Sequence, residues 1–497
     1  MDINVYFSDV FGVDPDLVEA YGAFNISLIN DLPLFIDPFL LFNSKKPEYQ
    51  ILHDEILRYV AFLRDMSIEG VINPGLLKNW FVFPEVKQNW LGYSEMGNDG
   101  HGLGIDFARS INKNLNQIFL NFGNETITKG SHLEKLCLIK AGVGRDNISD
   151  FTTNLIKGYL LEYTQKFAQN HIRQRIRRNF AVERVYFNYE TRSWVSKRFD
   201  LPIYNGNFVV LTPRDILTKD DTWINKSDIV NRFYDVVVAI PNQQLRAQIN
   251  QYFAMNLPRR KKKDGKSYKQ PSKKEIAEAV SHVITEYPEF IDYYIRFKED
   301  NGDEAKSVSE TRVQEVENLF VRELSGLIHT LIVKSHFYKT GSDTIDECYQ
   351  RVLFLKDVIE NKDGYRIFYI KGEPLKRESD LHIMFRLTWF ATPSDVSPET
   401  NDGRGPVDFK ISRESQDKTL VEFKLAGNSK LKQNLAKQVE IYKKAHDTDK
   451  AIKVILFFTY DEEQKVKAIL KELDIENEKY MVLIDARNDN KPSASIA

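Results

Sequence analysis

Cysteine is nearly absent from this chain, which excludes several classes of small cross-linked protein. Only Cys137 and Cys348 occur among the 497 residues, each inside an apolar segment, and neither belongs to a Cys-x-x-Cys pair. A disulfide framework and a zinc ribbon are therefore excluded, and the cysteine usage fits a reducing compartment. We expect a cytoplasmic protein.

Long apolar runs are missing as well. No stretch approaches the roughly 20 apolar residues that cross a membrane. The first residues, MDINVYFSDVFGVDPD, are acidic and lack the basic and apolar regions of a signal peptide. We therefore expect no membrane partner.

The motifs of several enzyme classes do not occur. The chain has no Walker A sequence, no Gly-x-Ser-x-Gly and no His-Glu-x-x-His. The glycine-rich stretch 97–104 matches no nucleotide-binding fingerprint, so ATP dependence is not supported. Its His101 is a lone loop histidine, for which a structural role is favoured over a catalytic one.

What is present describes a large globular chain. Hydrophobic residues make up 42 %, aromatic residues 12 % and charged residues 28 %, and the length suggests two or three domains. The formal net charge is −2. Any nucleic-acid binding must therefore come from local basic patches.

The first half of the chain mixes strand-like and helical patterns and predicts an α+β region over 1–255. The expected elements are strands at 23–29 and 32–42, a strand followed by a turn over 208–217, a helix within 101–122, and one long helix over 146–180. Residues 258–275 hold nine Lys/Arg against two acids and have no apolar periodicity. They predict a basic linker, which we place at 256–275.

A helical region is predicted over 276–362, because apolar residues recur there at three- and four-residue intervals. The pattern then changes to an α/β domain over 363–497. Its expected strands are 365–370, 407–412, 419–425, 454–460 and 480–485, and its expected helices are 379–391, 429–445 and 461–474.

Two of these strands carry charges where a buried strand should be apolar. Asp408 and Glu422 lie on consecutive strands, and Lys424 follows Glu422 by two residues, which places it on the same strand face. Adjacent strands lie about 5 Å apart, so the three groups can converge on one point. Two carboxylates there favour Mg²⁺ or Mn²⁺ as a bound ion. Such an ion could polarise a phosphodiester and activate a water.

The alternative is a structural ion pair in a half-buried sheet, and for a bare Asp…Glu-x-Lys pattern this is the better interpretation. The surrounding residues, however, favour a metal site. The run GRGPVDF allows close backbone approach just before Asp408. Gln438 and Tyr442 lie four residues apart, hence on one face of the following helix, where a core-facing tyrosine remains the alternative.

Together these residues resemble the PD-(D/E)XK nuclease superfamily, in the branch related to RecB nuclease domains. Asp408, the Glu422–Lys424 triplet, Gln438 and Tyr442 match in order and spacing, over about residues 375–460. The resemblance implies a restriction-endonuclease-like fold, a mixed sheet flanked by helices.

The same resemblance implies roles for the matching residues. Asp408 and Glu422 would be metal ligands, Lys424 the catalytic lysine, and Gln438 and Tyr442 neighbours of the scissile group. The family's helix acid is assigned to Glu378, with a charge at a helix N-terminus as the alternative.

Two departures accompany that match. Glu399 is a rival metal ligand, on a short strand just before Asp408. The proline of the family's PD signature is also displaced, because Pro406 stands two residues before Asp408 rather than next to it.

Basic residues outside this segment are candidates for nucleic-acid contact. Residues 171–180 hold four arginines and a histidine, which could follow a phosphate backbone or form an exposed helix face. The linker could hold nucleic acid or be solvated. The residues expected to bind nucleic acid are Arg173, Arg177, Arg259, Arg260, Lys261, Lys262, Lys263 and Lys432.

For Asp146 and Asp150, helix capping is favoured over a second acidic site.

The sequence therefore predicts a Mg²⁺- or Mn²⁺-dependent hydrolase of DNA phosphodiester bonds at the C-terminal end of a longer chain. By resemblance, residues 1–255 would sense or select the substrate, and the role would be bacterial antiphage defence. The alternatives are a repair or recombination nuclease and a non-cleaving nucleic-acid sensor built on a nuclease fold. Homo-oligomerisation stays open.

Overall fold

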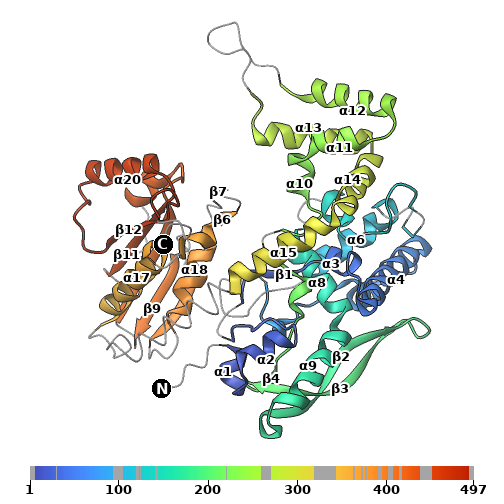
Figure 1. Ribbon diagram of the computed structural model, residues 1–497, viewed down its shortest axis with the longest axis horizontal. Helices are drawn as coiled ribbons and strands as arrows, with labels where there is room; N and C mark the ends of the chain where they lie inside the picture. The colour runs from blue at the N-terminus through green and yellow to red at the C-terminus, as the bar shows by residue number, and fades with distance from the viewer. Residues whose placement is uncertain are drawn as a thin grey trace.

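The computed structural model shows an N-terminal group of elements, a helical middle and a C-terminal sheet (Figure 1). The residues it describes are 6–28, 31–92, 104–118, 122–123, 125–139, 144–219, 221–258, 270–317, 343–361, 364–370, 373–374, 378–389, 394–400, 407–413, 417–436 and 450–491. Among these residues, no helix has the length and apolar character needed to cross a membrane.

The N-terminal group combines many helices with two small antiparallel sheets. One sheet pairs β1 with β5, and the other has the order β2-β3-β4. The helices are α1 (Phe7–Phe11), α2 (Pro15–Ala20), α3 (Pro38–Phe42), α4 (Pro47–Glu69), α5 (Pro74–Phe81), α6 (Ile105–Ile118), α7 (Lys135–Ile139), α8 (Arg145–Leu155) and α9 (Lys157–His171). The strands are β1 (Leu34–Ile36), β2 (Arg177–Asn188), β3 (Ser193–Tyr204), β4 (Asn207–Phe208) and β5 (Leu217–Lys219).

Several N-terminal strand predictions were wrong or too long. The run 32–42 is a strand only in β1, because Asp37 accepts a hydrogen bond from the backbone N–H of Phe39 (3.0 Å) and Pro38 opens α3. The described residues of the run 23–29, which are 23–28, form only isolated bridges at Ala23 and Ser27. Within 208–217 the strand is shorter than expected, because β4 ends at Phe208, but the expected turn is present as a 3₁₀ turn over Arg214–Ile216, just before β5 begins at Leu217. The helix expected within 101–122 is confirmed by α6.

The single helix expected over 146–180 is also wrong. It breaks at Ile156, between α8 and α9, and α9 ends at His171. The chain then passes through a 3₁₀ turn, Gln174–Ile176, and enters β2 at Arg177. The β-branched and aromatic residues that follow Arg177 pair with β3, and this pairing overrides the helical pattern of the arginine-rich run.

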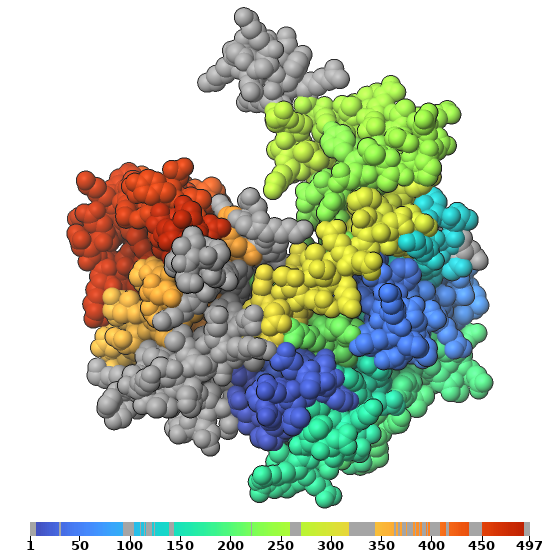
Figure 2. Space-filling view, in the orientation of Figure 1, coloured from blue at the N-terminus to red at the C-terminus, as the bar shows by residue number. Residues whose placement is uncertain are grey.

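The described residues of the predicted helical region, 276–317 and 343–361, are helical as expected, and three further helices precede them. The helices of the middle part are α10 (Lys226–Asn231), α11 (Phe233–Ala239), α12 (Gln243–Asn256), α13 (Lys273–Glu286), α14 (Glu289–Asp300) and α15 (Gly302–Val316). A reciprocal capping box between Ser272 and Glu275 starts α13. Figure 2 shows the residues of α15, in yellow, between the blue N-terminal helices and the C-terminal side of the molecule.

The C-terminal part is a five-stranded mixed sheet with the order β12-β11-β10-β9-β8. The strands β10, β11 and β12 run parallel, whereas β9 pairs antiparallel with both β8 and β10. The strands are β8 (Asp395–Thr400), β9 (Val407–Arg413), β10 (Asp417–Leu425), β11 (Ala451–Phe457) and β12 (Met481–Asp485). The helices are α17 (Thr344–Asn361), α18 (Glu378–Leu387) and α20 (Tyr460–Glu472). A small hairpin pairs β6 (Tyr369–Ile370) with β7 (Glu373–Pro374).

Helices cover both faces of this sheet. Val454 and Leu456 of β11 belong to the core shared with α17 and α18, whereas Ile455 and Phe457 pack with Val466 of α20. This two-sided burial explains the near-continuous apolar run of β11. The mixed α/β class predicted for the C-terminal region is confirmed. The strand expected at 365–370 is instead a 3₁₀ helix, Gly364–Phe368, followed by β6.

Helix α17, which its sequence pattern groups with the middle helices, packs against the C-terminal sheet. Its first residue, Thr344, donates a hydrogen bond from its hydroxyl to Asp417 Oδ1 (2.7 Å) on β10. One turn later, Glu347 is paired with Arg413 of β9 (2.6 Å). The sheet therefore has a helical neighbour that begins well before residue 363.

Candidate active site

The charged side chains predicted to converge do so where β9 begins and β10 nears its end. Lys424 Nζ lies 3.6 Å from Asp408 Oδ2 and 3.3 Å from Glu422 Oε1. The three side chains are only 14 %, 15 % and 10 % exposed, respectively. The result is a compact, largely desolvated group of two carboxylates and one ammonium.

The backbone fixes this arrangement. The β9–β10 ladder runs to the pair Val421–Phe409. Beyond it, Asp408 Oδ2 accepts a hydrogen bond from the backbone N–H of Phe423 (2.5 Å), and Lys424 Nζ donates to the Phe423 carbonyl (2.8 Å). The side chains of Asp408 and Lys424 are thus both held by the backbone of Phe423, which limits their freedom.

The strand register places acids in a row across the sheet. The β8–β9 pairs Pro398–Phe409 and Thr400–Val407 bracket Glu399 and Asp408, and Asp408 and Glu422 both adjoin the last β9–β10 pair, Val421–Phe409. On the other side, Glu422 pairs with Lys453 of β11. Directly opposed residues in antiparallel strands share a face, so the backbone brings three acidic positions to one side of the sheet.

Burial raises the pKa of the Glu422 carboxyl, and the nearby charge of Asp408 adds to this rise. The ammonium groups of Lys424 and Lys453 act in the opposite direction without cancelling it. The site therefore binds a proton more tightly than the unfolded chain does. A cation with greater charge than one ammonium would reverse this effect.

His382 is a neighbour of the site that the sequence pattern did not single out. Its Nε2 lies 3.7 Å from Asp408 Oδ2, and its ring contacts those of Phe409 and Phe423, with centroids 5.4 and 5.5 Å apart. The available signal was its four-residue spacing from Glu378, which puts both positions on one face of α18.

The remaining predicted site residues are described less fully. Glu378 is the first residue of α18 and Glu399 lies in β8, so the backbone of each is placed. Gln438 and Tyr442 lie outside the described residues, although the helix expected to carry them begins at Leu431. Within the described part of the chain, no three His, Cys, Asp or Glu side chains are grouped closely enough to hold a metal ion.

The residues expected to bind nucleic acid are not gathered in one place. Arg173 is exposed just before the 3₁₀ turn, whereas Arg177 is paired with Asp200 of β3 (2.9 Å) and is 13 % exposed. Lys432 is paired with Glu472 of α20. The exposed basic helix face considered for 171–180 is wrong, because this run spans the end of α9, a turn and a strand. The linker residues Arg259, Arg260, Lys261, Lys262 and Lys263 lie outside the described residues.

Helix capping by Asp146 or Asp150 was also a wrong prediction. The N-cap of α8 is Gly144, whose backbone N–H donates to Asn147 Oδ1 (2.9 Å). Burial raises the pKa of Asp150 to about 7, with Glu85 and Asp146 adding to the rise. Asp146 and Asp150 are thus part of a small acidic group rather than caps.

The fold and this site define a mixed α/β protein with a buried Asp–Glu–Lys group on its C-terminal sheet. Two family models match the chain, and both are described as domains of unknown function: DUF8370 over residues 12–225 and DUF8371 over residues 344–460. The second match begins at the first residue of α17 and contains the charged group. No curated protein and no solved structure matches the chain.

Proposed function

We propose that the C-terminal sheet carries a metal-dependent nuclease of the restriction-endonuclease-like fold, which hydrolyses DNA phosphodiester bonds. The observation that carries this proposal is the position of Lys424 Nζ within 3.6 Å of both the Asp408 and the Glu422 carboxylates. A buried acid is costly unless it is paired or binds a cation. Two such acids beside one lysine favour a site for a doubly charged ion and a phosphate.

The donor chemistry fits Mg²⁺ or Mn²⁺. Asp408 and Glu422 offer hard carboxylate oxygens, and Glu399 occupies the next position in the row across β8. Glu378 and His382, one turn apart on α18, are the further candidates to hold or orient the ion. A bound ion would polarise the phosphodiester and lower the pKa of an attacking water.

The protein's own residues would position the substrate and balance its charge. Lys424 is close enough to both acids to turn its ammonium toward a phosphoryl oxygen and stabilise the negative charge that develops there. The hydrogen bond from Phe423 N–H keeps the Asp408 carboxylate in place. The rings of Phe409 and Phe423 pack behind it against His382 and resist its displacement.

DNA as the substrate, and bacterial antiphage defence as the role, rest on the resemblance of the Asp408, Glu422–Lys424, Gln438 and Tyr442 pattern to RecB-like nucleases. We place the substrate-selecting function in the region before the sheet.

The test is cleavage of linear, circular and single-stranded DNA, and of RNA, with and without Mg²⁺. We expect Mg²⁺-dependent cleavage that Asp408→Ala and Lys424→Ala each reduce by at least about 10³-fold, because each removes charge from the reacting centre. Asp461→Ala, at an exposed position on α20, is the matched control and should cut normally. Undiminished cleavage by both site variants would exclude this site. Binding without cleavage by the wild type would favour the sensor alternative.

A further inference from the structure

A second candidate site lies in the N-terminal group, away from the charged row. It is a cavity of about 570 Å³ between the loop after α2, the start of α4, one face of α9, the 3₁₀ turn at Arg214–Ile216 and helix α15. This volume is in the range of small-molecule sites. Five separate segments build its wall, so its shape depends on the tertiary fold.

Tyrosine rings form one wall of the cavity. Tyr21 and Tyr163 have ring centroids 4.5 Å apart, Tyr159 stacks on Tyr163 at 6.0 Å, and Tyr49 meets Tyr159 edge-on at 6.1 Å. Tyr21 and Tyr163 each donate a hydroxyl hydrogen bond to the other's backbone carbonyl (2.9 and 3.0 Å). The rings are thereby held as a continuous aromatic surface.

The charges around this wall are predominantly negative. Glu48, Asp215 and Glu310 line the cavity, against Lys46 and Arg214. Arg214 is committed elsewhere, because its guanidinium is paired with Glu317 (2.9 Å) and also contacts Glu19 (3.5 Å). Two of the acids are engaged as well: Asp215 accepts hydrogen bonds from Lys46 and Tyr49 (both 2.6 Å), and Glu310 is paired with Lys306 (3.7 Å). The lining therefore offers a cation the carboxylate of Glu48 directly, and those of Asp215 and Glu310 in competition with these partners.

The acids around the cavity also affect the pKa values of the tyrosine hydroxyls. Burial raises the pKa of Tyr159 to about 12, and the charges of Glu48 and Asp215 contribute to that rise. Burial, together with Asp215, also raises the pKa of Tyr49 and of Tyr163. Aromatic faces beside carboxylates are the surroundings that stabilise an organic cation.

The chain's own lysine demonstrates this preference. Lys46 Nζ lies 4.6 Å from the centroid of the Tyr49 ring and donates a hydrogen bond to the Asp215 carboxylate at Oδ2 (2.6 Å). The Lys46 side chain is 50 % exposed. An exposed ammonium is therefore drawn onto the aromatic and acidic edge of the cavity, where it takes the place that a ligand's cation would occupy.

We propose that this cavity binds a small organic cation, a molecule that carries an ammonium or guanidinium group, against the tyrosine wall and the carboxylates of Glu48, Asp215 and Glu310. The proposal does not depend on nuclease activity. Five segments of one chain build the wall and the volume suits a small molecule, so the proposed occupant is a free small molecule.

The experiment is calorimetric titration of the full-length protein with agmatine and with choline, at constant ionic strength, with AMP as the anionic probe. We expect at least one cation to bind at millimolar concentration and AMP not to bind. Glu48→Gln should weaken cation binding about tenfold, which corresponds to about 1.4 kcal/mol. Its matched control is Glu69→Gln, an exposed acid at the other end of α4, which should leave binding unchanged.

The Lys46→Met substitution should change the affinity for the cation in the opposite direction. It removes the internal cation that competes for the site, so the same titration should show tighter cation binding. Failure of both cations to bind the wild type would overturn the proposal. It would also be overturned by equal losses in Glu48→Gln and Glu69→Gln, by weaker cation binding in Lys46→Met, or by binding of AMP in preference to the cations.

Discussion

Glu422 is the more deeply buried of the two described acids at the candidate active site, and this burial has a consequence for stability. Because its pKa is raised on folding, chiefly by burial, its contribution to stability is fully present below the pKa of the unfolded chain. That contribution is lost as the pH rises through the folded pKa. At neutral pH the ionised carboxylate therefore lowers the stability of the metal-free protein.

Replacement of Glu422 by Gln should accordingly stabilise the metal-free protein at neutral pH. The amide has nearly the same shape without the buried charge, and we expect a gain of about 1 kcal/mol. Urea unfolding at about pH 7.5 and about pH 4 checks this, since the gain should shrink at the lower pH. Asp461→Asn, at an exposed position, should show no such gain. A destabilised Glu422→Gln variant at neutral pH would mean that the ionised carboxylate is held favourably.

Magnesium should act on the same residues without any cleavage. A divalent ion that binds ionised Asp408 and Glu422 stabilises the folded state by about 1.4 kcal/mol at a concentration tenfold above its dissociation constant. We expect this stabilisation at about pH 8 and its loss at about pH 5, where protons compete for Glu422. Thermal unfolding with Mg²⁺ or EDTA measures the effect, and Asp408→Asn should abolish it. An equal Mg²⁺ effect in Asp408→Asn would place the ion elsewhere.

Helix α17 is joined to the sheet through a buried charge network. Glu347 is paired with Arg351 (3.0 Å) and with Arg413 of β9 (2.6 Å). It also accepts a hydrogen bond from the Ser394 hydroxyl (2.6 Å). The side chains of Glu347 and Arg351 are 4 % and 2 % exposed. The loss of one partner would leave buried charge without compensation.

Glu347→Gln should therefore destabilise the protein by about 3–5 kcal/mol, the scale for breaking a buried ion pair. Chemical denaturation followed by circular dichroism measures this. Asp346→Asn, on the same helix but half exposed and paired with the exposed Lys479 (3.7 Å), is the control and should cost about 1 kcal/mol or less. Similar losses in the two variants would show that burial does not govern the network.

Helices and strands of the C-terminal part were more predictable than those of the N-terminal part. The strands around 407–425, 454–460 and 480–485 match β9 to β12, because alternating or continuous apolar runs there lie between polar turns. The N-terminal errors have local causes. Pro38 opens a helix inside an apolar run, and the arginines after His171 show helical spacing although the next residues pair as a hairpin.

The candidate site was predictable in part. Strand geometry predicts that Lys424 lies on the same side as Glu422 and that Asp408 lies nearby. Both predictions agree with the observed contacts. Two features could not be derived. The row that includes Glu399 depends on the exact start of each strand, and the contact of His382 with Asp408 depends on how α18 packs on the sheet.

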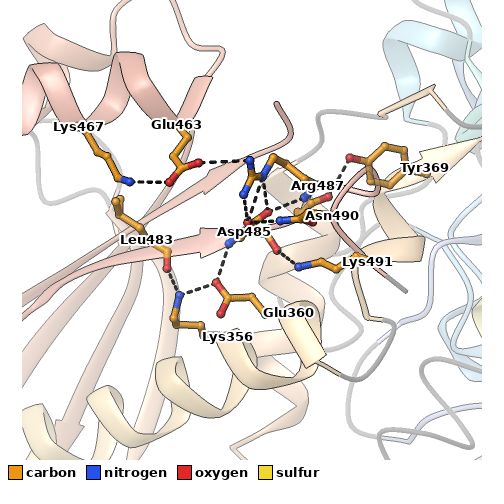
Figure 3. A network of polar contacts seen from close by, with 11 residues as sticks. Lys356, Glu360, Tyr369, Glu463, Lys467, Leu483, Asp485, Arg487, Asn490 and Lys491 are labelled. Carbon is orange, nitrogen blue, oxygen red and sulfur yellow. Dashed lines mark hydrogen bonds and ion pairs between the residues drawn. The ribbon is translucent and has the colours of Figure 1, made fainter. Parts of the chain in front are cut away.

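In the C-terminal part, polar contacts join helices and strands that are far apart in the sequence. Figure 3 shows Lys356 and Glu360 of α17 together with Asp485 at the end of β12. Lys356 Nζ donates to the Leu483 carbonyl (2.6 Å), and Asp485 N–H donates to Glu360 Oε1 (2.8 Å). Arg487 then joins Asp485 (2.7 Å) to Glu463 of α20 (3.4 Å). Helix α17 is thus connected to β12 and, through Asp485 and Arg487, to α20.

These contacts predict where the chain can be divided. A fragment of residues 343–497 should fold with a cooperative thermal transition, whereas a fragment of 363–497 should not. The shorter one lacks α17, whose buried Val352, Leu355 and Ile359 belong to the apolar core on one face of the sheet. Near-ultraviolet circular dichroism and limited proteolysis of both fragments measure this. A cooperative transition in 363–497, or its absence in 343–497, would show that α17 does not complete the folding unit of the sheet.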